Sequence, residues 1–323
     1  VADALIESRA PAYLAELIVD RAKNTAWAIL FICTLTGFVS AFVDNVATVL
    51  LIAPVALALA RKLKFDPTKM MIGIAISSNL QGAATLIGDT PSMMLGTAAG
   101  MSFMDFFWYQ GKPSICFAVQ CGAVASFFVL YAVFRRERHT LRLIREEKVA
   151  SWFPTVLLGM LITALAVSSF FKGRSPYTPG IICLIAGAIA IGWQKLFRKG
   201  SIIRGLRSLD YETTFFLMGI FVLVGSIGAT GWIDAFAREL TRLVHGNVFL
   251  GYTLIVFVSV LLSAFIDNIP YLAAMLPVVK TVSTGLGVAP ELLYFGLLIG
   301  ASLGGNVTPI GASANIAACG LLK

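Results

Sequence analysis

The sequence predicts an all-α polytopic membrane protein that consists of two inverted repeats, each with a re-entrant helical hairpin and a discontinuous helix. Three observations support this fold class. Hydrophobic residues make up 58% of the chain and charged residues only 13%, and the mean hydropathy is +0.86. Several apolar runs are long enough to cross a bilayer. A long segment of the chain also occurs twice.

The membrane-spanning segments follow from the apolar runs. Each of four runs is long enough to cross the hydrocarbon core as a helix, at 113–134, 152–171, 178–194 and 213–233. The five cysteines also lie in apolar runs without metal-ligand spacing, which favours small buried hydrophobic residues. Only two histidines occur, both in polar segments, and no phosphate-binding loop is present. Direct coupling to ATP within this chain is therefore not expected.

The duplication is clearest around two Asp-Asn pairs. Residues 40–46 read SAFVDNV and residues 263–269 read SAFIDNI, an offset of 223. The same offset pairs several prolines, glycines and a threonine: Pro54 with Pro277, Pro67 with Pro290, Gly82 with Gly305, Thr85 with Thr308 and Gly88 with Gly311. About fifty residues align without a gap, so the match is an internal repeat rather than a chance motif.

The basic residues predict the topology. Suppose that 26–60 leaves and returns on one side, and that 69–100, 113–134, 152–171, 178–194 and 211–228 each cross once. Then 19 of the 25 basic residues fall on one face, mainly in clusters at 61–64, 135–148 and 195–207. The positive-inside rule makes this face cytoplasmic. The net charge of +8 is thus explained by topology, and no nucleic acid partner is expected.

The same topology orients the two copies. Five crossings separate the two Asp-Asn pairs, and an odd number of crossings turns the second copy upside down relative to the first.

The repeats define the predicted domains. The first repeat is 1–134, the loop 135–151 is basic and cytoplasmic, and the second repeat is 152–323. The helices upstream of the second copy have no counterpart in the first, and 113–134 has none in the second. We therefore expect the native protein to carry at least two more helices at its N-terminus and one at its C-terminus.

Each Asp-Asn pair interrupts an apolar segment. Asp44-Asn45 lies at the centre of 26–60, and Asp267-Asn268 at the centre of 249–281. The arms on either side are short for a full span, which favours a re-entrant hairpin with the Asp-Asn pair at its tip near midmembrane. The alternative interpretation is an ordinary pair of helix caps at a surface turn.

A polar stretch then interrupts the next segment in each copy. In 69–100, Gly82 and Gly88 open the backbone, Asp89 or Thr90 caps the second half-helix, and Pro91 enters its first turn. The twin stretch, 303–315, has the same pattern, with Ser313 as the expected cap. Freed carbonyls, Thr hydroxyls and Asn amides suit a partly dehydrated cation, and half-helix N-termini suit an anion. We call the polar interruption of this segment the break. One such cavity per repeat is expected between a hairpin tip and the break of the same repeat.

Three carboxylates lie deep within apolar segments: Asp44, Asp89 and Asp267. An intramembrane carboxylate is costly and therefore points to function. Asp89 has no twin, because its equivalent is Ala312. The alternative for Asp89 is a purely structural N-cap.

The motifs SAFVDNVATVLLIAPV, SNLQGAATLIGDTPSMM, SAFIDNIPYLAAMLPV and GASLGGNVTPIGASANIAACG resemble the ion transporter superfamily. They are most similar to its branch of arsenite permease-like transporters and the melanosomal P protein. The resemblance implies two inverted repeats of five helices and a homodimer with a mobile transport unit on a static scaffold. Related divalent anion/sodium symporters carry Ser-Asn-Thr at the hairpin tips, where this chain has Asp44-Asn45-Val46 and Asp267-Asn268-Ile269. The added carboxylates favour a cation or proton role at the tips.

These features predict a secondary active transporter, not an enzyme, in a prokaryotic cytoplasmic membrane. It would move a small ion, such as arsenite or an organic anion, coupled to H⁺ or Na⁺ by alternating access, with no other cofactor. A Na⁺/H⁺ antiporter and an ion channel are the alternatives. The predicted ion-binding residues are Asp44, Asn45, Thr48, Asn79, Gly82, Thr85, Gly88, Asp89, Thr90, Asp267, Asn268, Asn306, Thr308, Gly311, Ser313 and Asn315. The candidates for Na⁺ are Asp44, Asn45, Thr85, Asp267, Asn268 and Thr308.

Overall fold

A computed structural model describes residues 1–22, 24–63, 65–135, 149–171, 175, 177–198 and 211–322. Lys64, residues 136–148 of the basic loop and residues 199–207 of the basic cluster lie outside the described residues. The chain divides into two compact units. The first unit contains Val1–Asp89, Ser102–Leu209 and Ala317–Lys323, and the second contains Thr90–Met101 and Asp210–Ile316.

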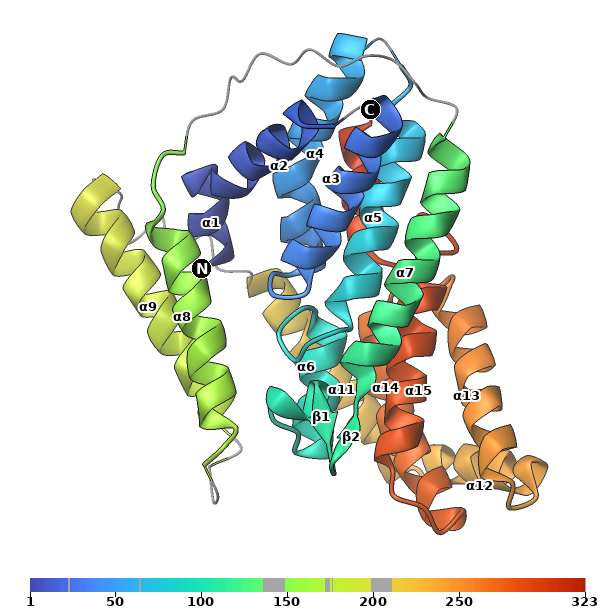
Figure 1. Ribbon diagram of the computed structural model, residues 1–323. Coiled ribbons are helices and arrows are strands. Elements are labelled where there is room, and N and C mark those ends of the chain that lie inside the picture. Colours follow the sequence, from blue (N-terminus) through green and yellow to red (C-terminus); the bar gives the residue numbers. More distant parts are fainter. Residues whose placement is uncertain are drawn as a thin grey trace. The chain divides into compact units, whose positions relative to one another are not determined.

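The first unit is a group of helices in which α3 packs against α5, and α5 against α4 and α7 (Figure 1). Its helices are α1 Ala2–Ser8, α2 Ala10–Asp20, α3 Thr25–Ser40, α4 Asn45–Leu63, α5 Thr68–Gly82, α7 Ile115–Phe134, α8 Phe153–Ser168 and α9 Thr178–Arg198. A short 3₁₀ helix, Met104–Phe106, precedes two paired strands, β1 Trp108–Tyr109 and β2 Lys112–Pro113. The sequence did not predict this hairpin. Its turn residues Gln110 and Gly111 both have positive φ angles, as a two-residue type I′ hairpin turn requires.

The second unit contains the helices of the second copy and one short helix from the first. Its elements are α6 Thr90–Ala99, α11 Tyr211–Ala229, α12 Trp232–Val244, α13 Val248–Ser263, α14 Asn268–Gly285 and α15 Glu291–Gly304. Helix α16, Ser313–Leu321, begins in this unit. In it, α13 packs along α15, α12 lies against α14, and α6 contacts both α14 and α15.

The helices end at the predicted interruptions. Helix α3 stops at Ser40 and α4 starts at Asn45, and the same gap separates α13 from α14. The polar stretches after Gly82 and after Gly304 also lie between helices. Within the described residues, α7, α9 and α11 are long and apolar enough to cross a membrane. The prediction of an all-α polytopic membrane protein is confirmed.

Glycine lets the second copy pack closely. On α15, a Cβ added at Gly304 would lie 2.5 Å from the carbonyl oxygen of Val260, and one at Gly300 would lie 2.7 Å from that of Val256. Small residues at four-residue spacing commonly allow such approach between membrane helices. In the first copy the glycine lies on the other helix of the pair. The equivalent of Gly304 is Gln81 on α5, and the equivalent of Val260 is Gly37 on α3. A Cβ at Gly37 would lie 2.9 Å from Cγ of Gln81.

Candidate functional site

Both tip carboxylates accept hydrogen bonds from the first turn of the following helix. Oδ2 of Asp44 accepts from the backbone N–H groups of Val46 and Ala47, at 3.0 and 3.3 Å. Oδ1 of Asp267 accepts from the N–H of Ile269 at 3.0 Å. These are N-cap contacts, and the helix dipole favours a negative charge at this place. Each tip is therefore built to stabilise a negative charge.

Each tip is tied to the break of its own copy by the same hydrogen bonds. The Thr85 hydroxyl donates to the carbonyl of Ala41, and its twin Thr308 donates to the carbonyl of Ala264. The Ser40 hydroxyl donates to the carbonyl of Ser78 at 2.9 Å.

The twin of Ser40 repeats this bond, since the Ser263 hydroxyl donates to the carbonyl of Ala301 at 2.9 Å. The offset found in the sequence thus recurs in the hydrogen bonding. We call the first cluster Ser40, Asn45, Ser78, Asn79 and Thr85, and the second cluster their equivalents Ser263, Asn268, Ala301, Ser302 and Thr308.

Glycines let each break fold back on itself. A Cβ added at Gly88 would lie 2.3 Å from the carbonyl oxygen of Gly82. A Cβ at the twin, Gly311, would lie 2.8 Å from the carbonyl oxygen of Gly305. No larger residue fits without moving backbone, so these glycines bring the two ends of each break together.

The side chains within the two clusters differ. In the first, Nδ2 of Asn45 approaches Oδ1 of Asn79 at 3.4 Å. Oδ1 of Asn45 lies 2.8 Å from the Ser40 hydroxyl, which shares its one proton between this oxygen and the carbonyl of Ser78. In the second, Ser302 replaces Asn79. The Ser302 hydroxyl is buried and has no hydrogen-bond partner within the described chain. Sequence analysis missed Ser302, although the offset of 223 pairs it with a predicted site residue.

Other predicted site residues fix the backbone around the clusters. Nδ2 of Asn315 donates to the carbonyls of Gly305 and Thr308 at 2.7 and 2.9 Å, and thereby closes the second break. Nδ2 of Asn306 donates to the carbonyl of Ser302 at 3.1 Å. The Thr48 hydroxyl donates to the carbonyl of Val43 at 3.2 Å.

The residues at the starts of the two half-helices also differ between the copies. Asp89 is 1% exposed and immediately precedes α6, which begins at Thr90 in the second unit. Ser313, predicted as a cap, is the first residue of α16, and its hydroxyl donates to Oδ2 of Asp267 at 2.8 Å. In the second copy, a hydrogen bond therefore links the start of half-helix α16 to the carboxylate at the hairpin tip.

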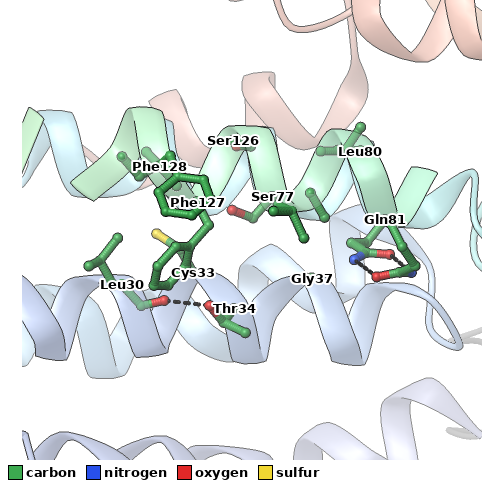
Figure 2. Close-up of a pocket in the computed structure, with 14 residues that line it drawn as sticks. Leu30, Cys33, Thr34, Gly37, Ser77, Leu80, Gln81, Ser126, Phe127 and Phe128 are labelled. Carbon is green, nitrogen blue, oxygen red and sulfur yellow. Dashed lines mark hydrogen bonds between the residues drawn. The ribbon is translucent and has the colours of Figure 1, made fainter. Parts of the chain in front are cut away.

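A cavity of about 270 Å³ lies between α3, α5 and α7 (Figure 2). Gln81 and Gln120, which line it, exchange two hydrogen bonds of 3.0 and 2.9 Å, and Cys33 and Ser77 also face it. None of the predicted ion-binding residues lines this cavity. It is therefore distinct from the cavity expected between a tip and a break. Within the described residues, no group of three or more His, Cys, Asp or Glu side chains could hold a metal ion.

Apolar helices interrupted twice by matching polar clusters define a membrane transport protein rather than an enzyme. The comparisons with known proteins give the family. Residues 1–300 match the model of the citrate transporter family, CitMHS, and the chain belongs to this family. The predicted resemblance to the ion transporter superfamily and its P protein branch is confirmed.

Relatives from bacteria and mammals match nearly the whole chain. An uncharacterized transporter of Mycobacterium tuberculosis is 31% identical over 316 residues, which cover 96% of this chain and 73% of the relative. An uncharacterized transporter of Synechocystis is 30% identical over 331 residues, covering 96% and 73%. The P protein of Homo sapiens is 27% identical over 384 residues, covering 93% of this chain and 45% of the relative. The chain is a transporter and a multi-pass integral membrane protein of a prokaryotic cell membrane.

Proposed function

We propose that the protein is a secondary active transporter that moves an organic anion of the citrate class, coupled to Na⁺ or H⁺. The observation that carries this proposal is the recurrence of the same tip-to-break hydrogen bonds in both copies, from Thr85 to Ala41 and from Thr308 to Ala264. Two such clusters at helix interruptions supply carbonyl, hydroxyl and amide oxygens for a cation and half-helix N-termini for an anion. The family match supports a carboxylate substrate over arsenite.

The tip carboxylates explain why an anion would need a coupling ion. Asp44 and Asp267 would repel a carboxylate substrate in a medium of low dielectric constant. Their N-cap contacts offset only part of that charge. A bound Na⁺ or proton would neutralise the rest. The cation would therefore bind before the anion.

We further propose that the two copies are inverted repeats, with re-entrant hairpins whose tips reach midmembrane from opposite faces. The repeats would be 1–134 and 152–323, joined by the cytoplasmic loop 135–151, and two copies of the chain would form the dimer. Alternating access would then consist of rocking one part of each chain around the fixed sites.

Cysteine labelling tests this topology. Asp66 and Ala289 are exposed and occupy equivalent loops between a hairpin and its broken helix. In a cysteine-free background, single cysteines at these positions should react with an impermeant maleimide from opposite sides of the membrane. Cysteines at the tip positions Val46 and Ile269 should react slowly from both sides. Labelling of both loop cysteines from one side would overturn the inverted arrangement.

Flux into proteoliposomes tests the transport function. Radiolabelled citrate should accumulate when an inward Na⁺ or H⁺ gradient is imposed, and uptake should saturate with citrate concentration. Parallel assays with arsenite and with empty liposomes serve as controls. Accumulation of arsenite without citrate would replace the substrate class, whereas non-saturating flux that ignores both gradients would indicate a channel.

A Na⁺/H⁺ antiporter is the second candidate, because Asp44, Asp89 and Asp267 place three carboxylates within otherwise apolar segments. This function needs no organic substrate. Proteoliposomes loaded with a pH-sensitive dye would then show Na⁺-driven proton efflux in the absence of citrate. A pH change that requires citrate would instead support symport.

A further inference from the structure

The cavity between α3, α5 and α7 lies within the first unit and contains none of the predicted ion-binding residues. Its volume is about 270 Å³, and none of the residues that line it is charged. An engineered cavity of about 150 Å³ holds benzene, so this one has room for roughly ten non-hydrogen atoms. The cavity therefore fits a small uncharged molecule or a single short chain.

The two ends of the cavity differ in chemistry (Figure 2). Gln81 and Gln120 meet at one end, where their side-chain amides exchange hydrogen bonds of 3.0 and 2.9 Å. Leu30, Phe127 and Phe128 lie at the other end. The cavity thus matches an amphiphile, with its polar group at the amides and its apolar body against the aromatic rings.

The amide pair keeps some hydrogen-bonding capacity. Each amide oxygen accepts one bond from the other amide, and an amide oxygen has two lone pairs. The second N–H of Gln81 makes no hydrogen bond within the described chain. A hydroxyl group both donates and accepts, so one hydroxyl can bond to a remaining lone pair and to this N–H together.

The cavity opens at a surface of apolar side chains. Thr34, Val124 and Phe128 line it and are exposed, Val124 by 57% and Phe128 by 64%. Helix α7, which carries the last two, is long and apolar enough to cross a membrane. A molecule dissolved in the bilayer can therefore enter from the side. Amide groups without partners are costly in hydrocarbon, which favours an occupant that can bond to them.

The second copy shows that packing of this helix pair does not need the polar residues. Helices α13 and α15 pack along each other as their equivalents α3 and α5 do. Yet three polar positions of the first copy are apolar or glycine in the second: Thr34 corresponds to Phe257, Ser77 to Gly300 and Gln81 to Gly304. The contact between the two helices therefore does not explain the polar lining.

We infer that this cavity is a binding site for a neutral single-chain lipid with a hydroxyl head, which bonds to the amides of Gln81 and Gln120 while its chain lies against Phe127. A charged head is disfavoured, because no charged side chain lines the cavity. A plain hydrocarbon chain would leave the amide groups unsatisfied. The site is separate from both clusters, and the inference does not depend on the proposed transport.

Photolabelling of the protein in lipid nanodiscs tests this site. The probe is 3-azioctanol, an octanol that carries a photoreactive diazirine, and mass spectrometry locates the adducts. In wild-type protein the adducts should concentrate on the segments of α3, α5 and α7 that line the cavity. Unlabelled 1-octanol should compete for them. Octane should need a membrane concentration about tenfold higher, because it cannot make the hydrogen bonds.

Two substitutions separate the polar end from the volume of the cavity. Gln120→Leu removes one amide and keeps a side chain of similar size, so the tenfold preference for 1-octanol over octane should disappear. Ala123→Leu fills the cavity from α7 and should abolish labelling of the lining segments. Ala125→Leu is its matched control, since Ala125 is exposed on the same helix and does not line the cavity. It should leave labelling within about twofold, a small free-energy change.

Size-exclusion profiles identify the folded fraction of each variant, and Gln120→Leu decides alone if Ala123→Leu does not fold. Equal competition by octane and 1-octanol in wild type would overturn the inference, because it indicates ordinary contact with acyl chains. An unchanged preference for 1-octanol in folded Gln120→Leu would also overturn it and reduce the amide pair to a link between α5 and α7. Equal loss of labelling in Ala125→Leu would show that the adducts do not report this cavity.

Discussion

In the first copy, the Asn79 amide lies against Asn45, whereas in the second copy Ser302 stands in its place and leaves Asn268 without that contact. The backbone framework around them is nonetheless the same, since Thr85 and Thr308 bond to equivalent carbonyls. The duplicated scaffold is thus maintained by hydroxyl-to-carbonyl bonds and by glycines. The side chains at the centre are free to diverge. A single substrate between two related halves requires some divergence of this kind.

The largest expected effect comes from neutralising the tips, which tests whether both copies contribute to coupling. Asp44→Asn and Asp267→Asn keep an N-cap side chain and remove the charge. Gradient-driven citrate uptake should fall to the background of empty liposomes in either variant. Thermal stability should hold, because asparagine keeps a side-chain oxygen that can accept the N-cap hydrogen bonds.

Asp105 provides the matched control for these substitutions. Its carboxylate accepts a hydrogen bond of 2.6 Å from the backbone N–H of Ser102, outside both clusters. Asp105→Asn should leave uptake unchanged. If Asp44→Asn and Asp267→Asn also keep full gradient dependence, the tip carboxylates are caps and nothing more.

The next effect concerns stability, where the copies pack differently. Gly304→Ala should destabilise the protein by about 1–3 kcal/mol, because its new Cβ would press on the carbonyl of Val260. Gly187→Ala in α9 has open space around it and should instead stabilise by about 0.5–1 kcal/mol. Thermal unfolding in detergent measures both. Equal midpoints for the two variants would show that the helices of the second copy can separate at little cost.

A smaller effect is expected at Asp89, which Ala312 replaces in the second copy. Asp89→Ser keeps a capping side chain and removes the charge, so it should shift the apparent substrate affinity or ion selectivity more than the maximal rate. Asp89→Ala should show the same shift and also lose about 1 kcal/mol of stability. Wild-type affinity and selectivity in the Ser variant would reduce Asp89 to a cap.

The smallest effect lies in the loop before each broken helix, where Asp66 corresponds to Ala289. The hydroxyl and backbone N–H of Thr68 both donate to the Asp66 carboxylate, and these bonds lower its pKa. The stabilisation is therefore present at neutral pH and is lost as the pH falls below about 4, through the lowered pKa. Asp66→Ala should lower the unfolding midpoint slightly at pH 7 and less at pH 3. An equal shift at both pH values would contradict this origin.

The sequence predicted the interruptions better than their surroundings. Asp44-Asn45 and the polar stretch after Gly82 stand out within apolar runs, so the helix ends could be placed from pattern alone. The burial of Ser302 without a hydrogen-bond partner in the described chain and the hairpin turn at Gln110 could not be foreseen in this way. A serine in an apolar helix gives no local signal of an unfilled partner, and glutamine is not a usual residue for a left-handed turn.

The sequence also could not predict which helices pack against each other. The glycines on α15 are visible in the sequence, but which helix they meet depends on tertiary contacts. The same holds for α6, whose buried residues Pro91, Ser92, Met94, Leu95 and Gly96 belong to the first copy by sequence and to the second unit by contact.

The placement of α6 has a consequence for biogenesis. This helix of 10 residues is too short to persist alone, and its partners α14 and α15 begin only at Asn268. During synthesis at about 5–20 residues per second, the first copy must therefore wait for most of the chain before its half-helix can dock. Until then the helix that follows the polar break after α5 has no packing partners in the second unit. A nascent chain that ends after α9 therefore presents the residues of α6 without the two helices that α6 contacts.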